Sequence, residues 1–133
     1  MEQRVFEEKI HRFNTEMPEY CPITYSMKII GSKWKIPILW KLMLEDGQHY
    51  NHLKRMVGNI TNTMLTKSLR ELEEAKLLER HDDKTVPPSV TYHLTNLGKE
   101  LIYTMEGLFD WGQEIHDARE SWTLIKRGCD ISL

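Results

Sequence analysis

Short polar and basic side chains gather on one side of a helix expected in the middle of the chain. Leu65, Leu69 and Leu72 recur at helical spacing and predict an amphipathic helix over about 62–75. The opposite face carries hydroxyl, amide and cationic groups: Asn62, Thr63, Thr66, Lys67 and Arg70. The DNA major groove admits one α-helix, and its base edges are read by Arg, Lys and short hydrogen-bonding side chains. We therefore predict a recognition helix; the alternative is a polar face that only meets water.

The segment before this helix fits the first half of a helix-turn-helix. A helix is predicted over about 49–57, with Tyr50 among its inward residues, and Gly58-Asn59 ends it. Thr61 then stands where it can cap the recognition helix. Two short helices joined by a glycine-containing turn are typical of DNA-binding proteins. Lys54 on the first helix is expected to contact a phosphate, which positions a protein on DNA without specifying sequence.

The segment after the recognition helix fits a wing. Strands are predicted over 77–82 and 89–94, because Val90, Tyr92 and Leu94 alternate with polar residues. The loop 83–88 between them is too long for a tight hairpin, and Lys84 in it is a second candidate for a phosphate contact.

Further helices are expected over about 4–14, 23–30, 34–45 and 96–118, the last capped by Thr95. The predicted fold is α+β and mainly α: a winged helix-turn-helix with an extra N-terminal helix and a long C-terminal helix for dimerisation. We expect one domain over 1–133, with an N-terminal helical arm over 1–19, a core over about 20–115 and a patternless tail over 119–133.

The last helix is longer than so small a domain can cover. Its apolar seam runs from Leu97 to Ile115, and we expect the start of the seam in the core and its end at a homodimer interface. The predicted interface consists of Val5, Ile10, Phe13, Leu108, Trp111 and Ile115. Two-fold symmetry would place two recognition helices about one helical turn of DNA apart, so the expected partner is double-stranded DNA with an inverted-repeat operator.

The distribution of charge supports an anionic partner. The whole chain has a net charge of −2, but residues 24–70 hold eight bases and only two acids. Such asymmetry indicates one basic face on an acidic body and favours DNA over the other interpretation that we weigh, a winged-helix module for protein–protein contact.

Several classes of function are not supported by any motif. No apolar run approaches the roughly 20 residues that cross a membrane, and the N-terminus lacks a signal-peptide core, so we expect a cytoplasmic protein without a membrane partner. Phosphate-binding loops and nucleophile elbows are missing, so no enzyme and no cofactor are expected. His49 and His52 share a helix face without further ligands at suitable spacing, and we expect no metal site.

Several segments together resemble the HxlR-type regulators of the MarR-like superfamily over roughly residues 20–115. These segments are Cys21-Pro22, Ile30-Gly31-Ser32-Lys33-Trp34, Gly47 to Leu53, Thr63-Met64-Leu65-Thr66, Leu69 to Glu73, Pro87 to Gly98, and Trp111-Gly112. The resemblance implies a homodimeric winged-helix regulator of transcription in bacteria or archaea. The chain departs from the family pattern at His49-Tyr50, where Arg-Phe is usual, and at Ser89-Val90-Thr91-Tyr92, where Arg-Val-Glu-Tyr is usual. Losing the wing Arg leaves Lys84 as the nearer candidate for a contact there.

The resemblance also singles out Cys21, because some HxlR-type proteins sense electrophiles or oxidants through the cysteine of this Cys-Pro motif. The thiol precedes the helix expected from residue 23, and a helix N-terminus favours thiolate, the form that reacts with quinones, aldehydes or peroxide. A small reactive effector is therefore a candidate partner; the alternative is a cysteine that only packs. Cys129, in the patternless tail, is the poorer candidate, although a disulfide between it and Cys21 across two subunits is conceivable.

Overall fold

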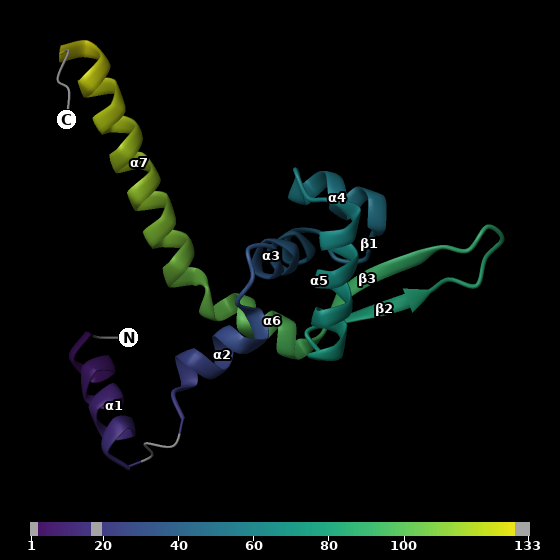
Figure 1. The fold of residues 1–133 in the computed structure, drawn as a ribbon, viewed down its shortest axis with the longest axis horizontal. Coiled ribbons are helices and arrows are strands. Elements are labelled where there is room, and N and C mark those ends of the chain that lie inside the picture. Colours follow the sequence, from purple (N-terminus) through teal and green to yellow (C-terminus); the bar gives the residue numbers. More distant parts are fainter. Residues whose placement is uncertain (1–2, 17–19, 130–133) are drawn as a thin grey trace.

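Apolar side chains from four helices and two strands, together with Ile30 at the end of the preceding helix, meet in one core. The computed structural model describes residues 3–16 and 20–129. Helices α3 (Lys35–Leu44), α4 (Tyr50–Val57), α5 (Asn62–Glu74) and α6 (Asn96–Thr104) surround this core together with strands β2 (Leu78–Asp82) and β3 (Val90–Leu94). The largest fully buried side chains are Ile38, Leu39, Leu42, Leu53, Leu65, Leu72 and Leu78. The order of helix, turn, helix and hairpin is the predicted winged helix-turn-helix (Figure 1).

The turns between these elements form for local reasons that the sequence predicted. Thr61 caps α5, because its hydroxyl accepts a hydrogen bond from the amide of Met64 at 3.1 Å. Thr95 caps α6 in the same way through the amide of Gly98 at 3.0 Å. Gly58, which ends α4, has a φ of 74°, a conformation that glycine adopts without steric cost. The predicted boundaries of both helices of the helix-turn-helix are thereby confirmed to within a residue.

The wing is a three-stranded antiparallel sheet rather than the predicted two-stranded hairpin. A short strand that we did not predict, β1 (Gln48–His49), pairs with β3, and the strand order is β1-β3-β2. In the outer pair, Leu78 lies opposite Leu94 and Asp82 opposite Val90. The amide of Asp83 donates to the carbonyl of Ser89 at 2.8 Å and closes the loop at the tip. β2 and β3 project from the body of the domain (Figure 1).

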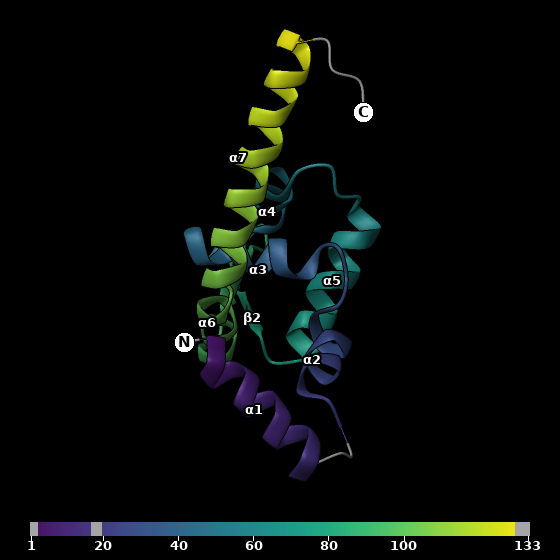
Figure 2. The same cartoon turned by 90° about the vertical axis from the view of Figure 1, so that its left-hand side faces the viewer.

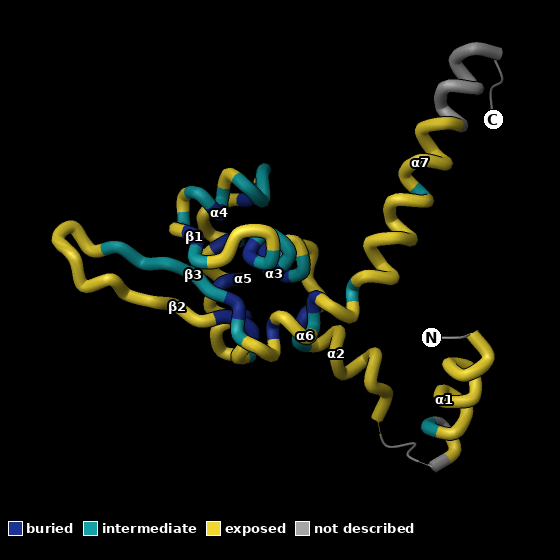
Figure 3. Tube along the Cα trace, turned by 180° about the vertical axis from the view of Figure 1, so that it is seen from behind, coloured by how far each residue is buried: buried dark blue, intermediate teal, exposed yellow. Residues whose placement is uncertain are grey.

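Two helices at the ends of the chain lie outside the core. α1 (Gln3–Glu16) and most of α7 (Glu106–Cys129) stand apart from the winged-helix body, whereas the start of α7 contacts α3 through Phe109 and Trp40. α2 (Pro22–Ile30) leads from α1 into the body (Figures 1 and 2). Nearly all described residues of α1 and α7 are exposed, in contrast to the buried segments of α3, α5 and α6 (Figure 3). None of the helices in the described part of the chain is long and apolar enough to cross a membrane.

The predicted last helix is wrong in two respects. It divides at Met105 into α6 and α7, and the helix changes direction there (Figure 1). At this residue the amide of Met105 donates to the carbonyl of Ile102, three residues back, at 2.9 Å, as in a 3₁₀ turn. The helix then continues to Cys129, so most of the predicted tail is helical; residues 130–133 of that tail lie outside the described residues. Leu97, predicted in the core, is 51% exposed, and Ile102 is buried in its place.

Candidate nucleic-acid interface

The predicted recognition helix α5 presents its polar residues to solvent as one face. Asn62, Thr63, Thr66, Lys67 and Arg70 are all exposed. The residues buried on the other side are Leu65, Ser68, Leu69 and Leu72. The first turn contains no acidic residue, so the positive end of the helix dipole is not neutralised there. This arrangement gives the first two turns of α5 the donors and acceptors that a base edge requires.

The two basic side chains of α5 are paired with acids one turn further along. Lys67 Nζ lies 3.9 Å from Oε1 of Glu71, and Arg70 Nε lies 4.0 Å from Oε1 of Glu74. Both cations are more than half exposed, and ion pairs of this kind on a helix surface stabilise by only about 0.3–0.5 kcal/mol. Lys67 and Arg70 can therefore leave these pairs for DNA at little cost.

Tyr50 joins the first helix of the motif to the recognition helix through its hydroxyl group. The hydroxyl lies 3.0 Å from the carbonyl oxygen of Asn62, 3.4 Å from Oδ1 of Asn62 and 3.1 Å from Oγ1 of Thr66. Its ring packs against the core, as predicted. The sequence did not predict the polar contacts; the only signal was a tyrosine where HxlR-type chains usually have phenylalanine.

A buried lysine also holds α5 in place. Lys35, one of the eight bases within residues 24–70, is 8% exposed, so it does not contribute to the predicted basic face. Its ammonium donates to the carbonyl of Ile29 at 2.9 Å and lies 2.9 Å from Oε2 of Glu71. The hydrogen bond from Lys35 holds the pKa of Glu71 below its usual value, and the charges of Lys35, Lys67 and Arg70 act in the same direction.

The other two predicted DNA contacts lie on either side of α5 in sequence. Lys84 is exposed in the wing loop with a φ of 51°, and its amide donates to Oδ1 of Asp82 at 3.2 Å. Lys54 is half-buried in the last turn of α4. Acidic Asp82 at the end of β2 and Asp83 in the loop lie beside it, so Lys84 is not part of a uniformly basic tip.

The histidines considered for a metal site have other partners. Nδ1 of His49 lies 3.1 Å from the carbonyl of Val90, and Nε2 of His52 lies 3.1 Å from Oε2 of Glu45. The described residues contain no group of three or more His, Cys, Asp or Glu side chains that could hold a metal ion.

The apolar residues predicted at a dimer interface are largely exposed in the single chain. Val5, Ile10, Leu108 and Trp111 are 44–59% exposed, while Phe13 and Ile115 are half-buried.

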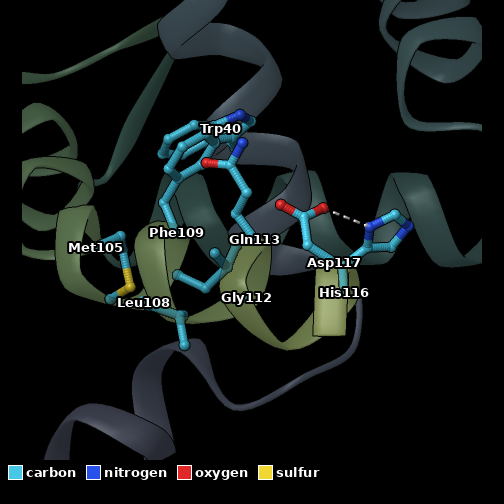
Figure 4. A pocket seen from close by; sticks show the side chains of 9 residues that line it. Trp40, Met105, Leu108, Phe109, Gly112, Gln113, His116 and Asp117 are labelled. Carbon is cyan, nitrogen blue, oxygen red and sulfur yellow. Dashed lines mark hydrogen bonds and ion pairs between the residues drawn. The ribbon is translucent and has the colours of Figure 1, made fainter. Parts of the chain in front are cut away.

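An open pocket of about 630 Å³ lies where α7 meets α3, with Trp40 and Phe109 stacked at 5.3 Å between ring centroids (Figure 4). Met105, Leu108 and Gly112 line the same pocket. Large contiguous apolar patches on soluble proteins mark interaction sites.

Cys21 is an exposed free thiol directly before α2. The amide and hydroxyl of Thr24 and the amide of Ile23 lower the pKa of Cys21, because they stabilise the thiolate. The side chain of Cys129, and with it the disulfide considered between the two cysteines, lies outside the described residues.

The recognition helix and wing define a winged helix-turn-helix, the class of DNA-binding proteins that regulate transcription. The chain belongs to the HxlR-like helix-turn-helix family, whose model matches residues 29–120. MalR of Fusobacterium mortiferum is 39% identical over 94 residues, which cover 71% of this chain and 89% of MalR. YybR of Bacillus subtilis, an uncharacterized helix-turn-helix transcriptional regulator, is 36% identical over 104 residues. These residues cover 78% of this chain and 82% of YybR. Among solved structures, the redox regulator HypR in its reduced form has a TM-score of 0.67 and 36% identity, covering 76% of this chain and 99% of HypR.

Proposed function

We propose that this chain regulates transcription as a homodimer that reads an inverted-repeat operator. The observation that carries the proposal is the exposed polar face of α5, which Thr61 caps and whose first turn contains no acidic residue. The residues of this face are Asn62, Thr63, Thr66, Lys67 and Arg70. Arg70 and Lys67 approach base edges, and the three shorter side chains support them. Lys54 and Lys84 contact phosphates and set the position of the helix on the duplex. Because the target is chromosomal DNA, the protein works in the cytoplasm.

The second copy is needed for tight and specific binding. One recognition helix buries too little surface for the affinities typical of specific regulators, whereas two helices related by a two-fold axis contact two half-sites. The exposed apolar residues of α1 and α7 supply the surface at which the copies meet.

The experiment that tests this function is genome-wide mapping of bound sites, followed by binding of the purified protein to the recovered sequences over a series of salt concentrations. We expect inverted repeats with half-site centres about 34 Å apart. The logarithm of the binding constant should fall linearly with the logarithm of the salt concentration, with a slope of about −0.9 for each phosphate that the protein neutralises. Enrichment of no sequence, together with salt-independent or undetectable binding, would favour the alternative of a winged helix for protein–protein contact.

A second function, redox or electrophile sensing, is favoured by one specific observation. Cys21 is exposed at the start of α2 next to amides that stabilise its thiolate. HypR, which shares 36% identity with the chain, is a redox regulator. We propose that a quinone, aldehyde or oxidant modifies Cys21 and changes operator binding through α1 and α2, since these helices connect Cys21 to the dimer surface.

A further inference from the structure

In two of its three contacts the Tyr50 hydroxyl can only be the donor, and these two assign the direction of the third. A phenol has one proton to donate. The carbonyl oxygen of Asn62 at 3.0 Å and Oδ1 of Asn62 at 3.4 Å are acceptors only. The proton of Tyr50 therefore goes to Asn62, and the phenol oxygen is left to accept.

The remaining contact then determines the role of Thr66. Its Oγ1 lies 3.1 Å from the Tyr50 oxygen, and one of the two hydroxyls must be the donor. Because the proton of Tyr50 is committed to Asn62, Thr66 donates to Tyr50. The hydroxyl of Thr66 is exposed on the DNA-facing side of α5, yet its proton is no longer available, so it offers the groove only lone pairs.

The major groove distinguishes acceptors from donors base by base. Adenine presents an N6 amino donor beside its N7 acceptor, and cytosine presents an N4 amino donor, whereas guanine presents only N7 and O6 acceptors and thymine an O4 acceptor beside its methyl group. A free serine or threonine hydroxyl reads either kind, because it can donate or accept. A threonine whose proton is already used is attracted to an amino group and repelled by O4 or O6.

We propose that Tyr50 is a specificity-determining positioning residue, which holds the Thr66 hydroxyl as an acceptor so that α5 selects adenine or cytosine at the base that Thr66 faces. The inference rests on the proposed role of α5 as the recognition helix. Tyr50 itself does not need to touch DNA; it acts through Thr66 and through the first residue of the helix, Asn62. The hydroxyl is the one group by which Tyr50 differs from the phenylalanine usual at this position in HxlR-type chains.

The test is the full base preference of the wild-type dimer and three variants, measured on operators that carry each of the four bases at every position. Thr66→Ala locates the base pair that Thr66 reads. Tyr50→Phe removes only the hydroxyl and keeps the ring in the core. Tyr103→Phe is the matched control. Tyr103 is 66% exposed on α6, and among the described residues no hydrogen bond joins its side chain to α5. Thermal denaturation of each variant reports whether the fold is retained.

We expect the wild type to favour adenine or cytosine at the Thr66 position by about tenfold, within the usual discrimination per base pair. Tyr50→Phe should lose that preference at this base pair alone, and keep both the other preferences and the affinity for unrelated DNA; Tyr103→Phe should match the wild type. A wild-type preference for guanine or thymine at this position, or an unchanged profile in Tyr50→Phe, would overturn the inference while leaving the DNA-binding function intact. A wild type that shows no sequence preference at any position would instead refute the proposed function.

Discussion

The ammonium of Lys35 lies 2.9 Å from Oε2 of Glu71, and this contact joins the start of α3 to the last turn of α5. The same ammonium donates to the carbonyl of Ile29 at the end of α2, so one buried cation connects three helices. Glu71 is one residue beyond Arg70 and four beyond Lys67. The orientation of the recognition face is therefore coupled to a charge inside the domain.

Replacing this cation should destabilise the fold. We expect Lys35→Met to lower the free energy of unfolding by about 1–2 kcal/mol, less than the 3–5 kcal/mol typical when a fully buried pair is broken, because the Glu71 side chain is 34% exposed and water can solvate it. Lys67→Met is the matched control: it removes a lysine that faces the same carboxylate from a 58% exposed position, and should change stability by less than about 0.5 kcal/mol. Urea denaturation measures both; equal losses would contradict a special role for Lys35.

The lowered pKa of Glu71 gives this pair a pH dependence. A carboxyl whose pKa is lower in the folded than in the unfolded state stabilises the fold above its unfolded pKa, about 4.3 for glutamate, and loses that contribution as pH falls through the folded pKa. Wild type should therefore exceed Glu71→Gln in stability at pH 7, and the difference should shrink as the pH falls from about 5 towards 3. Denaturation of both proteins across this range checks it, and a gap that stays constant or widens with acid would be evidence against the assignment.

The sequence predicted the helix-turn-helix because periodicity and capping residues act locally. The leucines of α5 and the caps Thr61 and Thr95 are each readable within a few residues. β1 is only two residues long, so no alternation is visible, and it exists because it pairs with β3 some 40 residues later. The break at Met105 is marked by no proline or glycine at that residue. Lys35 looks like Lys33 in sequence, and only the packing of α2 and α5 buries one and leaves the other exposed.

The basic residues at the interface should separate into two groups by their effect on DNA binding. Arg70→Ala should cost about 1–3 kcal/mol on the operator and little on unrelated DNA, because a bidentate base contact is lost. Lys54→Ala should weaken all DNA alike and lower the salt slope by about one. Lys84 has a positive φ, so Lys84→Asn removes the charge with less backbone strain than alanine and should behave like the Lys54 variant. Titrations on operator and random DNA at several salt concentrations measure this. If Arg70→Ala and Lys67→Ala both left operator affinity unchanged, α5 would not be the recognition helix.

A charge on the exposed apolar face of α7 should dissociate the dimer. Trp111 is 59% exposed in the single chain, so Trp111→Glu should leave the winged-helix core folded while preventing association, since an unpaired carboxylate is costly to bury. Val86→Glu adds the same charge at a 99% exposed residue of the wing and is the control. Sedimentation at micromolar concentration should give a dimer for wild type and Val86→Glu and a monomer for Trp111→Glu. A wild type that sediments as a stable monomer and still binds a single half-site tightly would exclude the proposed assembly.

Cys21 should react faster than an ordinary thiol, and its modification should alter operator binding. Because neighbouring amides and the Thr24 hydroxyl lower the pKa of Cys21, more of it is thiolate at a given pH, and its alkylation by iodoacetamide should persist to lower pH than that of a free cysteine. Treatment with a quinone or with diamide should then change the affinity for the operator by about tenfold, within the range of coupling between two sites. Cys21→Ser should bind DNA normally and not respond, whereas Cys129→Ser should respond like the wild type; mass spectrometry identifies the modified residue. Equal responses of wild type and Cys21→Ser, or no response in either, would leave Cys21 without a sensing role.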